Sequence, residues 1–204
     1  RIHALNLLWW RVVRQSGTDT DYGCCGHSLG FYAAAVAAGS LTEDMSFRWL
    51  QAMFNLAWDE FAENTGKLAV ITTNAPVGSH SLAHHYSVEV LAINSVYQIV
   101  VYGGEQDIER LCHGLGGALI RRDDIDARIP FHSISMWRVA ETVAARAADL
   151  GLTVAAPSQT LWSHITGERL PSAEQVFATL TRQPGQTLLW QQLGRNLGFE
   201  HYPE

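Results

Sequence analysis

The segment Gly26-His27-Ser28-Leu29-Gly30 places one serine between two glycines, in the pattern G-x-S-x-G. This pattern is typical of a sharp turn between a strand and a helix, which exposes the serine hydroxyl. We expect the strand at residues 22–26 and the helix at residues 29–38, where alanines allow close packing. Unpaired N–H groups at the start of that helix would stabilise negative charge beside Ser28. The spacing therefore predicts a nucleophilic serine.

A serine nucleophile needs a general base within hydrogen-bond reach, and the chain has nine histidines. His80, His84 and His85 lie close together in sequence, but no carboxylate or cysteine accompanies them at the spacing of a metal site, so we expect no metal. His132 follows the last strand of a predicted small subdomain and precedes a helix, where a loop can return to the serine. This place makes His132 the leading candidate for the base.

The elements around the serine read as helices. A helix is predicted over residues 2–15, with a core-facing stripe of Ile2, Leu5, Trp9 and Val12 that is too short to cross a bilayer. A second helix begins near Thr42, with acidic residues in its first turn, and ends before Gly66. A third helix is predicted over residues 133–150.

The section between residues 66 and 130 has a different pattern. Strands are predicted at residues 67–73, 88–93, 97–103 and 118–123, with a weak helical pattern after the first strand and a helix at residues 105–115. The order β-α-β-β-α-β is typical of a ferredoxin-like unit. We therefore predict an α/β protein with a large subdomain at residues 1–65 and 131–204 and an inserted small subdomain at residues 66–130.

Composition narrows the class of protein. The chain has 204 residues, of which 47% are hydrophobic and 17% charged, as in a packed globular protein. The net charge is −6 and no Lys/Arg run is longer than Arg121-Arg122, which argues against a nucleic-acid partner. The N-terminal apolar run is too short for a membrane span, so we expect no membrane partner. The odd number of cysteines, three, favours a reducing compartment and a cytoplasmic location.

Four segments resemble one known family in order and approximate spacing. They are GHSLGFYAAAVAAGSLTEDM (26–45), VEVLAINSVYQIVVYGG (88–104), IPFHSISM (129–136) and LTRQPGQTLLW (180–190). The family is the acyltransferases that include malonyl-CoA:acyl-carrier-protein transacylase and the acyltransferase domains of polyketide and fatty acid synthases. The resemblance implies an α/β-hydrolase-like large subdomain with a ferredoxin-like (βαββαβ) small subdomain.

In that family a serine takes an acyl group from one phosphopantetheine thioester and gives it to another, with a Ser–His dyad. Carried onto the matching positions of this chain, the resemblance makes Ser28 the nucleophile and His132 the base. It also makes the Leu29 N–H an oxyanion donor and the carbonyl of Gln183 the group that orients the histidine. It implies no cofactor, because the phosphopantetheine thioester of coenzyme A or of a carrier protein is the substrate.

Five more residues are expected at the substrate. His27 and Asn94 resemble the histidine and asparagine near the family's site. Malonyl-transferring members have an arginine where this chain has Met53, and a methionine cannot pair with a carboxylate. Phe31 replaces the family's glutamate and makes the elbow or the pocket entrance more apolar, while Phe131 resembles the malonyl-type AFH pattern of a narrow pocket. Together they predict a small, uncharged, unbranched acyl group, not malonyl.

The sequence also differs from the family at its ends. The family has a preceding strand that supplies a second oxyanion N–H, and it continues beyond the position of Glu204. We therefore expect that this chain lacks the family's first strand and its C-terminal end.

Three functions stay open. The first is acyl transfer with acyl-CoA and an acyl carrier protein as partners, docked on Arg121, Arg122 and Arg128 unless these arginines form an ordinary solvated face beside nearby aspartates. The second is an acyl-thioester hydrolase that clears carrier proteins. The third is a non-catalytic module that binds a carrier protein.

Overall fold

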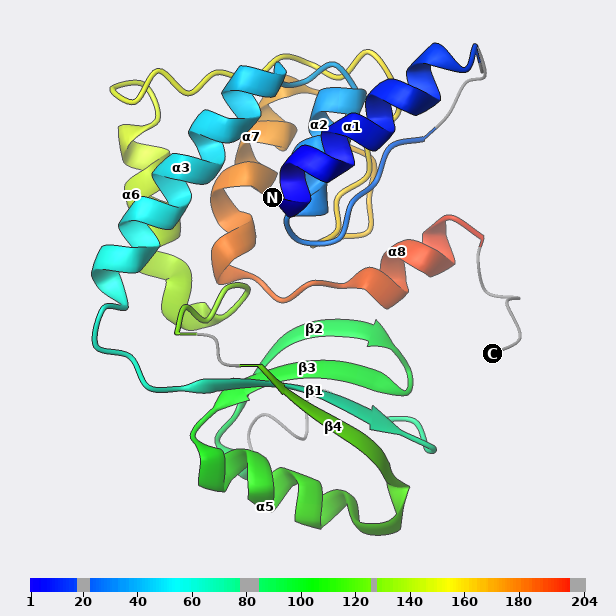
Figure 1. Ribbon diagram of the computed structural model, residues 1–204, viewed down its shortest axis with the longest axis vertical. Coiled ribbons are helices and arrows are strands. Elements are labelled where there is room, and N and C mark those ends of the chain that lie inside the picture. Colours follow the sequence, from blue (N-terminus) through cyan, green and yellow to red (C-terminus); the bar gives the residue numbers. More distant parts are fainter. Residues whose placement is uncertain (18–22, 78–84, 126–127, 199–204) are drawn as a thin grey trace.

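The computed structural model describes residues 1–17, 23–77, 85–125 and 128–198. A body of helices lies on one side of a four-stranded sheet (Figure 1). The main helices of this body are α1 (Ile2–Gln15), α2 (Gly30–Ala37), α3 (Glu43–Glu60), α6 (Trp137–Arg146) and α7 (Ala173–Arg182). Helices α1, α2 and α3 lie where the sequence predicts helices.

The sheet comprises β1 (Lys67–Thr73), β2 (Glu89–Ser95), β3 (Gln98–Gly103) and β4 (Leu119–Ile125). The strand order is β2-β3-β1-β4 and each neighbouring pair is antiparallel, as in a ferredoxin-like unit. The helix expected after the first strand falls mostly on residues 78–84, outside the described residues. The predicted division of the chain at residues 66 and 130 stays a prediction.

The two faces of the sheet follow the alternation of side chains along a strand. Ile99 and Val101 of β3 are buried under α5 (Glu105–Leu115), where they pack with Ile108 and Leu111. The residue between them, Val100, packs on the opposite face of the sheet. One face is thus covered by α5, and the other faces the helical body (Figure 1).

A short extended segment joins the helical body to strand β2. Leu188 donates from its N–H to the carbonyl of Leu91 (2.9 Å), and its own carbonyl accepts from the N–H of Ile93 (2.8 Å). Helix α8 (Trp190–Asn196) follows this segment and packs beside β2. This segment directly follows the turn at Gln183–Gly185, which later contributes to the candidate site.

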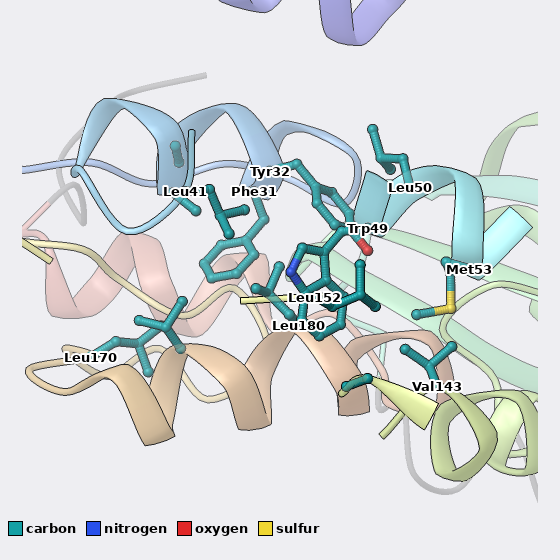
Figure 2. Packing of buried hydrophobic residues seen from close by; sticks show 14 of the residues in the cluster. Phe31, Tyr32, Leu41, Trp49, Leu50, Met53, Val143, Leu152, Leu170 and Leu180 are labelled. Atoms are coloured by element: carbon teal, nitrogen blue, oxygen red, sulfur yellow. The ribbon is translucent and has the colours of Figure 1, made fainter. Parts of the chain in front are cut away.

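The core of the helical body lies between α2, α3, α6 and α7 (Figure 2). Phe31 of α2, Trp49 of α3 and Leu180 of α7 are fully buried there. The alanines of α2 let this helix pack closely against its neighbours, since Ala34, Ala35 and Ala38 are buried in the same cluster. The Ala-rich run thus serves close packing, as predicted, with helices α1 and α3 as its neighbours.

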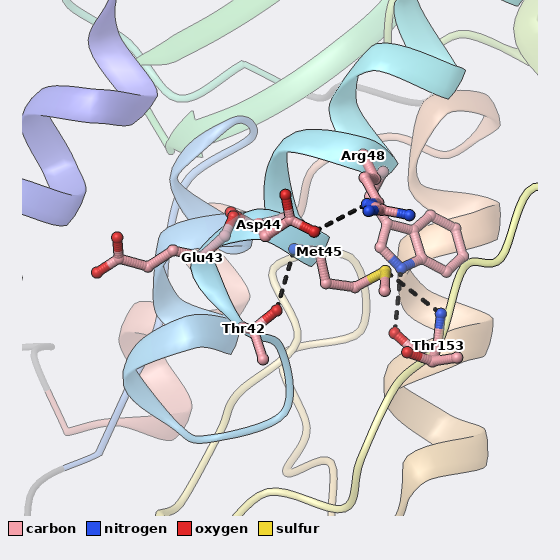
Figure 3. Close-up of polar contacts among 8 residues, drawn as sticks. Thr42, Glu43, Asp44, Met45, Arg48 and Thr153 are labelled. Atoms are coloured by element: carbon pink, nitrogen blue, oxygen red, sulfur yellow. Dashed lines mark hydrogen bonds and ion pairs between the residues drawn. The ribbon is translucent and has the colours of Figure 1, made fainter.

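Helix α3 begins at a capped N-terminus (Figure 3). The Thr42 hydroxyl oxygen accepts a hydrogen bond from the N–H of Met45 (3.1 Å), and Asp44 pairs with Arg48 one turn later. At the same end, the Met45 sulfur accepts from the N–H of Thr153, and Trp49 Nε1–H donates to the Thr153 carbonyl. These contacts fix the start of the helix that later contributes Met53 to the site.

Two sequence expectations differ from the structure. Of the strand predicted at residues 22–26, residue 22 lies outside the described residues, and residues 23–26 form only a bridge between Cys24 and Leu161 before the chain turns into the serine elbow. The stripe of Ile2, Leu5, Trp9 and Val12 does not face the core; these side chains are exposed, Trp9 by 69%. Helix α1 instead turns His3 and Leu7 inward. Helical spacing therefore found this helix but not its buried face.

The helix predicted over residues 133–150 is shorter in the structure. A 3₁₀ turn, η2 (Ile134–Met136), leads into α6, which ends at Arg146. Within the described ranges, no helix is both long and apolar enough to cross a membrane.

Candidate active site

The serine elbow is built around a close backbone contact. Ser28 has φ +52°, a left-handed backbone conformation. Residues other than glycine adopt it only where the surrounding structure enforces it. A Cβ added to Gly26 would lie 2.2 Å from the backbone of Gly30, so position 26 accepts only glycine without a shift. A Cβ added to Gly30 meets nothing within 4 Å. Of the two glycines in the motif, only the first is required by space.

His132 lies beside the serine. The Ser28 hydroxyl oxygen is 2.8 Å from Nε2 of His132, and Nδ1 of His132 is 2.9 Å from the main-chain carbonyl oxygen of Gln183. The backbone N–H of His132 also donates to the carbonyl of Pro184 (2.7 Å). The structure thus brings together the three residues that the sequence placed in a dyad and its support.

These contacts set the tautomer of His132. A carbonyl can only accept, so Nδ1 carries the proton and donates it to Gln183, which leaves Nε2 as the acceptor for the Ser28 hydroxyl. Burial lowers the pKa of His132 to about 4, and the Gln183 carbonyl opposes this shift. The imidazole is therefore neutral at pH 7, which is the form that a general base requires.

The backbone at the start of α2 offers a hydrogen-bond donor. The N–H of Gly30 donates to the His27 carbonyl, and the N–H of Phe31 donates to that of Ser28. The N–H of Leu29 has no backbone acceptor among the described residues. It is the donor that the family resemblance assigns to an oxyanion, and it directly follows the nucleophile.

A small cavity opens on the serine. Its volume is about 60 Å³, and its lining combines the dyad with apolar side chains: Ser28, Leu29, Tyr32, Leu50, Met53, Phe54, Phe131, His132, Gln183 and Pro184. Met53 and Phe131, which are expected at the substrate, therefore line the cavity beside Ser28. Phe31 does not line this cavity; it is fully buried on the flank of the elbow, against the ring of His164. Of the two places expected for Phe31, it therefore occupies the flank of the elbow and not the pocket entrance.

A wider, open hollow of about 680 Å³ also reaches Ser28. It is bordered by α1, by the elbow and by Trp190, and it includes His27. His27 Nε2 lies 2.9 Å from Oδ1 of Asn94, whose amide donates to Gln98 on β3. The structure thus brings His27 and Asn94 together at the edge of the site, with the helical body on one side and the sheet on the other.

His164 was not singled out in the sequence. It is fully buried, with its ring centroid 4.7 Å from that of Phe31 and 6.2 Å from that of His132. Burial is the main cause that lowers its pKa well below the ordinary value, and the nearby His132 and His27 lower it further. The only feature of the sequence that could have pointed to His164 is its place after a serine in the turn-rich run WSHITG.

Two other groups of residues stand out in the sequence, one of histidines and one of arginines. Their described members do not line the cavity at Ser28. Of the histidine group, His80 and His84 lie outside the described residues, and His85 stacks edge-on against Tyr86. In the described part of the chain no three potential ligands are grouped as a metal site. Arg121 and Arg122 pair with neighbouring acids, as in the solvated-face alternative.

Arg128 lies over the ring of Trp58, 5.1 Å from its centroid. It is thus held against an aromatic side chain of α3. With Arg121 and Arg122 in local ion pairs, the three arginines do not form a free basic patch.

Comparisons with known proteins agree with the geometry. No family model matches the chain. A non-reducing polyketide synthase of Aspergillus flavus is 28% identical over 149 residues, which are 73% of this chain and 7% of that protein. A malonyl CoA-acyl carrier protein transacylase of Salmonella typhimurium is 24% identical over 188 residues, 89% of this chain and 60% of that protein. The relatives that the motifs predicted are therefore found, and the chain spans only part of their length.

The solved structures give the same fold. A malonyl-transacylase in complex with a type II polyketide synthase acyl-carrier protein superimposes with a TM-score of 0.81 at 24% identity, over 97% of this chain and 64% of that one. The predicted fold class, an α/β-hydrolase-like subdomain with a ferredoxin-like one, is confirmed.

Proposed function

We propose that this chain is an acyltransferase that moves an acyl group between two phosphopantetheine thioesters through an acyl-enzyme on Ser28. The observation that carries the proposal is the dyad: a serine hydroxyl 2.8 Å from a neutral imidazole whose other nitrogen is held by a main-chain carbonyl. The acyltransferase relatives support the same reaction class.

In the first half-reaction the Ser28 oxygen attacks the carbonyl carbon of the thioester while Nε2 of His132 takes the hydroxyl proton. The new C–O bond gives a tetrahedral intermediate, whose oxyanion the N–H of Leu29 stabilises. The C–S bond then breaks, and Nε2 returns its proton to the departing thiolate. The products are the free thiol and the acyl ester of Ser28.

The second half-reaction runs these steps in reverse. Nε2 of His132 removes the proton of the acceptor thiol, whose sulfur attacks the ester carbonyl, and the Ser28 oxygen leaves and regains the proton. Throughout, the Gln183 carbonyl accepts from Nδ1–H, so it stabilises the imidazolium that forms twice in each cycle. No carboxylate is needed for these steps.

We further propose that the acyl group is small and uncharged. No side chain that lines the cavity carries a charge at pH 7, and the cavity volume is about 60 Å³. A carboxylate placed there would lose its hydration without gaining a cation, which costs several kcal/mol. The relatives named for malonyl transfer support the transacylase reaction but not this finer choice.

For the partners, we propose an acyl-CoA or an acylated carrier protein as donor and an acyl carrier protein as acceptor. One solved structure with this fold is a malonyl-transacylase bound to its carrier protein. Apolar lining beside the ester also favours a thiol over water as acceptor, because apolar side chains offer a water molecule few hydrogen-bond partners there.

The test is intact-protein mass spectrometry after brief mixing with acetyl-CoA, malonyl-CoA or hexanoyl-CoA. We expect an acetyl adduct that is absent in Ser28→Ala and that disappears when a carrier protein with a free phosphopantetheine thiol is added. His132→Ala should slow adduct formation by roughly 10²–10⁴-fold. Loss of the adduct to water at the same rate with and without carrier protein would identify a hydrolase. No adduct with any donor on a folded chain would contradict the proposal and favour a non-catalytic module.

A further inference from the structure

A strip of apolar side chains continues from the Ser28 cavity along helix α3. Leu50 and Phe54 line the cavity, and Trp58 follows Phe54 by about one helical turn on the same face. The side chains of Phe54 and Trp58 are both exposed. Phe54 thus joins the cavity lining to an exposed aromatic surface on α3.

Two residues of the loop before α6, Phe131 and Arg128, lie beside this aromatic surface. The ring centroid of Phe131 is 5.0 Å from that of Phe54. Cζ of Arg128 is 5.1 Å from the ring centroid of Trp58. The main-chain carbonyl of Arg128 also accepts from the side-chain amide of Asn64 (2.9 Å). Arg128 is therefore held at the end of the aromatic surface that lies farther from the cavity.

The guanidinium of Arg128 has no carboxylate partner among the described residues. It differs in this from Arg121 and Arg122, which form local ion pairs. The planar N–H groups of a guanidinium fit two oxygens of a phosphate, and here no acid competes for them. A phosphate is thus the anion that Arg128 is best suited to bind.

The arm of a phosphopantetheine thioester has suitable groups at both of its ends. The thioester is the group that reacts at Ser28, and the other end is a phosphate in coenzyme A and in a carrier protein alike. Helix α3 rises about 12 Å from Leu50 to Trp58. The extended arm is about 15 Å long, by the dimensions of a main chain with as many bonds. An arm with its thioester at Ser28 therefore reaches Arg128.

The other way out of the site offers a phosphate no such partner. The wide hollow beside His27 and Trp190 also reaches Ser28, but none of the described residues that line it is a lysine or an arginine. The cavity itself, at about 60 Å³, is too small for an acyl group and the arm together. The arm must therefore leave the cavity, and the surface along α3 is the exit that ends at a fixed cation.

We propose that Arg128, held on Trp58, binds the phosphate of the phosphopantetheine arm, and that the arm lies along Phe54 and Trp58. The identity of the ligand rests on the proposed acyl transfer, whereas binding of the arm needs no reaction. Arg128 sets the affinity for the arm and leaves the chemical step at Ser28 unchanged.

The test uses the whole chain and two probes that cannot acylate it, 4′-phosphopantetheine and pantetheine, which differ only by the phosphate. NMR titration should show that the phosphate strengthens binding roughly tenfold or more. Arg128→Gln should remove this difference. The matched control is Arg138→Gln, at another exposed arginine beside the end of α3, and it should keep the difference. A wild-type chain that does not bind the phosphate-bearing probe more tightly, or an unchanged difference in Arg128→Gln, would overturn the inference.

Two variants at Trp58 test how Arg128 is held. Trp58→Phe keeps an aromatic face under the guanidinium and should keep the effect of the phosphate, whereas Trp58→Ala removes that face and should reduce the effect. The Trp58 side chain is exposed, so both variants should fold, which circular dichroism checks. An alanine variant with the full effect of the phosphate would overturn the role of Trp58.

Acylation kinetics distinguish the sources of the arm and keep the two proposals apart. With acetyl-CoA and with an acetylated carrier protein, Arg128→Gln should raise the half-saturating donor concentration roughly tenfold at an unchanged maximal rate. An effect with acetyl-CoA alone would place its nucleotide phosphates at Arg128 and overturn the assignment to the arm. A chain that binds 4′-phosphopantetheine through Arg128 but forms no acyl-enzyme would refute the acyl transfer and support the binding site. A chain that is acylated with the same half-saturating concentration in Arg128→Gln would do the reverse.

Discussion

The hydroxyl oxygen of Ser28 lies 2.8 Å from Nε2 of His132, although 104 positions separate the two residues in sequence. Both residues have positive φ, +52° for Ser28 and +72° for His132. Such conformations are costly for residues other than glycine and persist only where the surrounding structure enforces them. The fold thus holds both partners of the dyad in strained backbone, and each is fixed by its own neighbours: the elbow for the serine, the Gln183 turn for the histidine.

The first prediction concerns the pH dependence of acyl-enzyme formation. His132 has to be neutral to accept the serine proton, and burial lowers its pKa from 6.5 to about 4. The rate should therefore stay on its plateau as the pH falls through 6.5 and reach half of its maximum only near pH 4. Rapid pH-jump acylation with an uncharged acyl donor measures this profile.

The control for that profile is the folded state. Tryptophan fluorescence in the same seconds after the pH jump shows whether the chain is still folded, since seven tryptophans report on it. A half-maximal rate between pH 6 and pH 7 on folded protein would mean that His132 is not buried as described.

The second prediction separates the two glycines of the elbow. Gly26→Ala puts a Cβ at 2.2 Å from the backbone of Gly30, and no side chain is present there to move aside. We expect it to lower the free energy of unfolding by about 1–3 kcal/mol and to abolish rapid acylation. Gly30→Ala meets nothing within 4 Å and is the matched control, which should retain stability and activity. Equal behaviour of the two variants in urea unfolding would contradict this account of the elbow.

The dyad and the sheet were predictable because they depend on local signals. The G-x-S-x-G spacing located Ser28, and runs of strand-forming residues located the four strands along the chain. The place of His132 after a predicted strand made it the leading candidate for the base, but only the family resemblance selected Gln183. A carbonyl that orients a histidine belongs to the backbone, so no residue type at that position could reveal it.

The parts that sequence missed depend on long-range packing. Helical spacing gave α1 but assigned the wrong face to the core, because which stripe is buried depends on where α2 lies. His164 lies between Phe31 and His132, residues more than 30 positions away in either case, so its burial leaves no local trace. Cys24, Cys25 and Cys112 are free thiols, and the reducing, cytoplasmic location inferred from them stays a prediction.

The third prediction tests the cap of helix α3 (Figure 3). Thr42→Ala removes the oxygen that accepts from the N–H of Met45, and such a loss costs about 1 kcal/mol. Urea unfolding should show this loss, with acylation at saturating donor unchanged. Thr42→Ser keeps the oxygen and should lose only a few tenths of a kcal/mol. If the serine variant were as unstable as the alanine variant, the methyl group and not the hydrogen bond would carry the effect.

The fourth prediction concerns the choice of acyl group at Met53. Met53 lines the cavity at Ser28, and all other lining residues are uncharged at pH 7. Met53→Arg would supply the missing partner for a carboxylate, so malonyl loading should appear and the ratio of malonyl to acetyl adduct should rise at least tenfold. A tenfold change corresponds to about 1.4 kcal/mol, less than the several kcal/mol that burial of an unpaired carboxylate costs.

The control and the contrary outcome use the same competition assay, with equal concentrations of acetyl-CoA and malonyl-CoA and intact-mass detection. Met53→Leu keeps an apolar side chain of similar size and should keep the preference for acetyl. The arginine variant buries a charge at a position that is only 2% exposed, so it should be less stable without ligand and be stabilised by malonyl-CoA. Wild-type protein that loads malonyl as fast as acetyl would show that a group other than residue 53 binds the carboxylate.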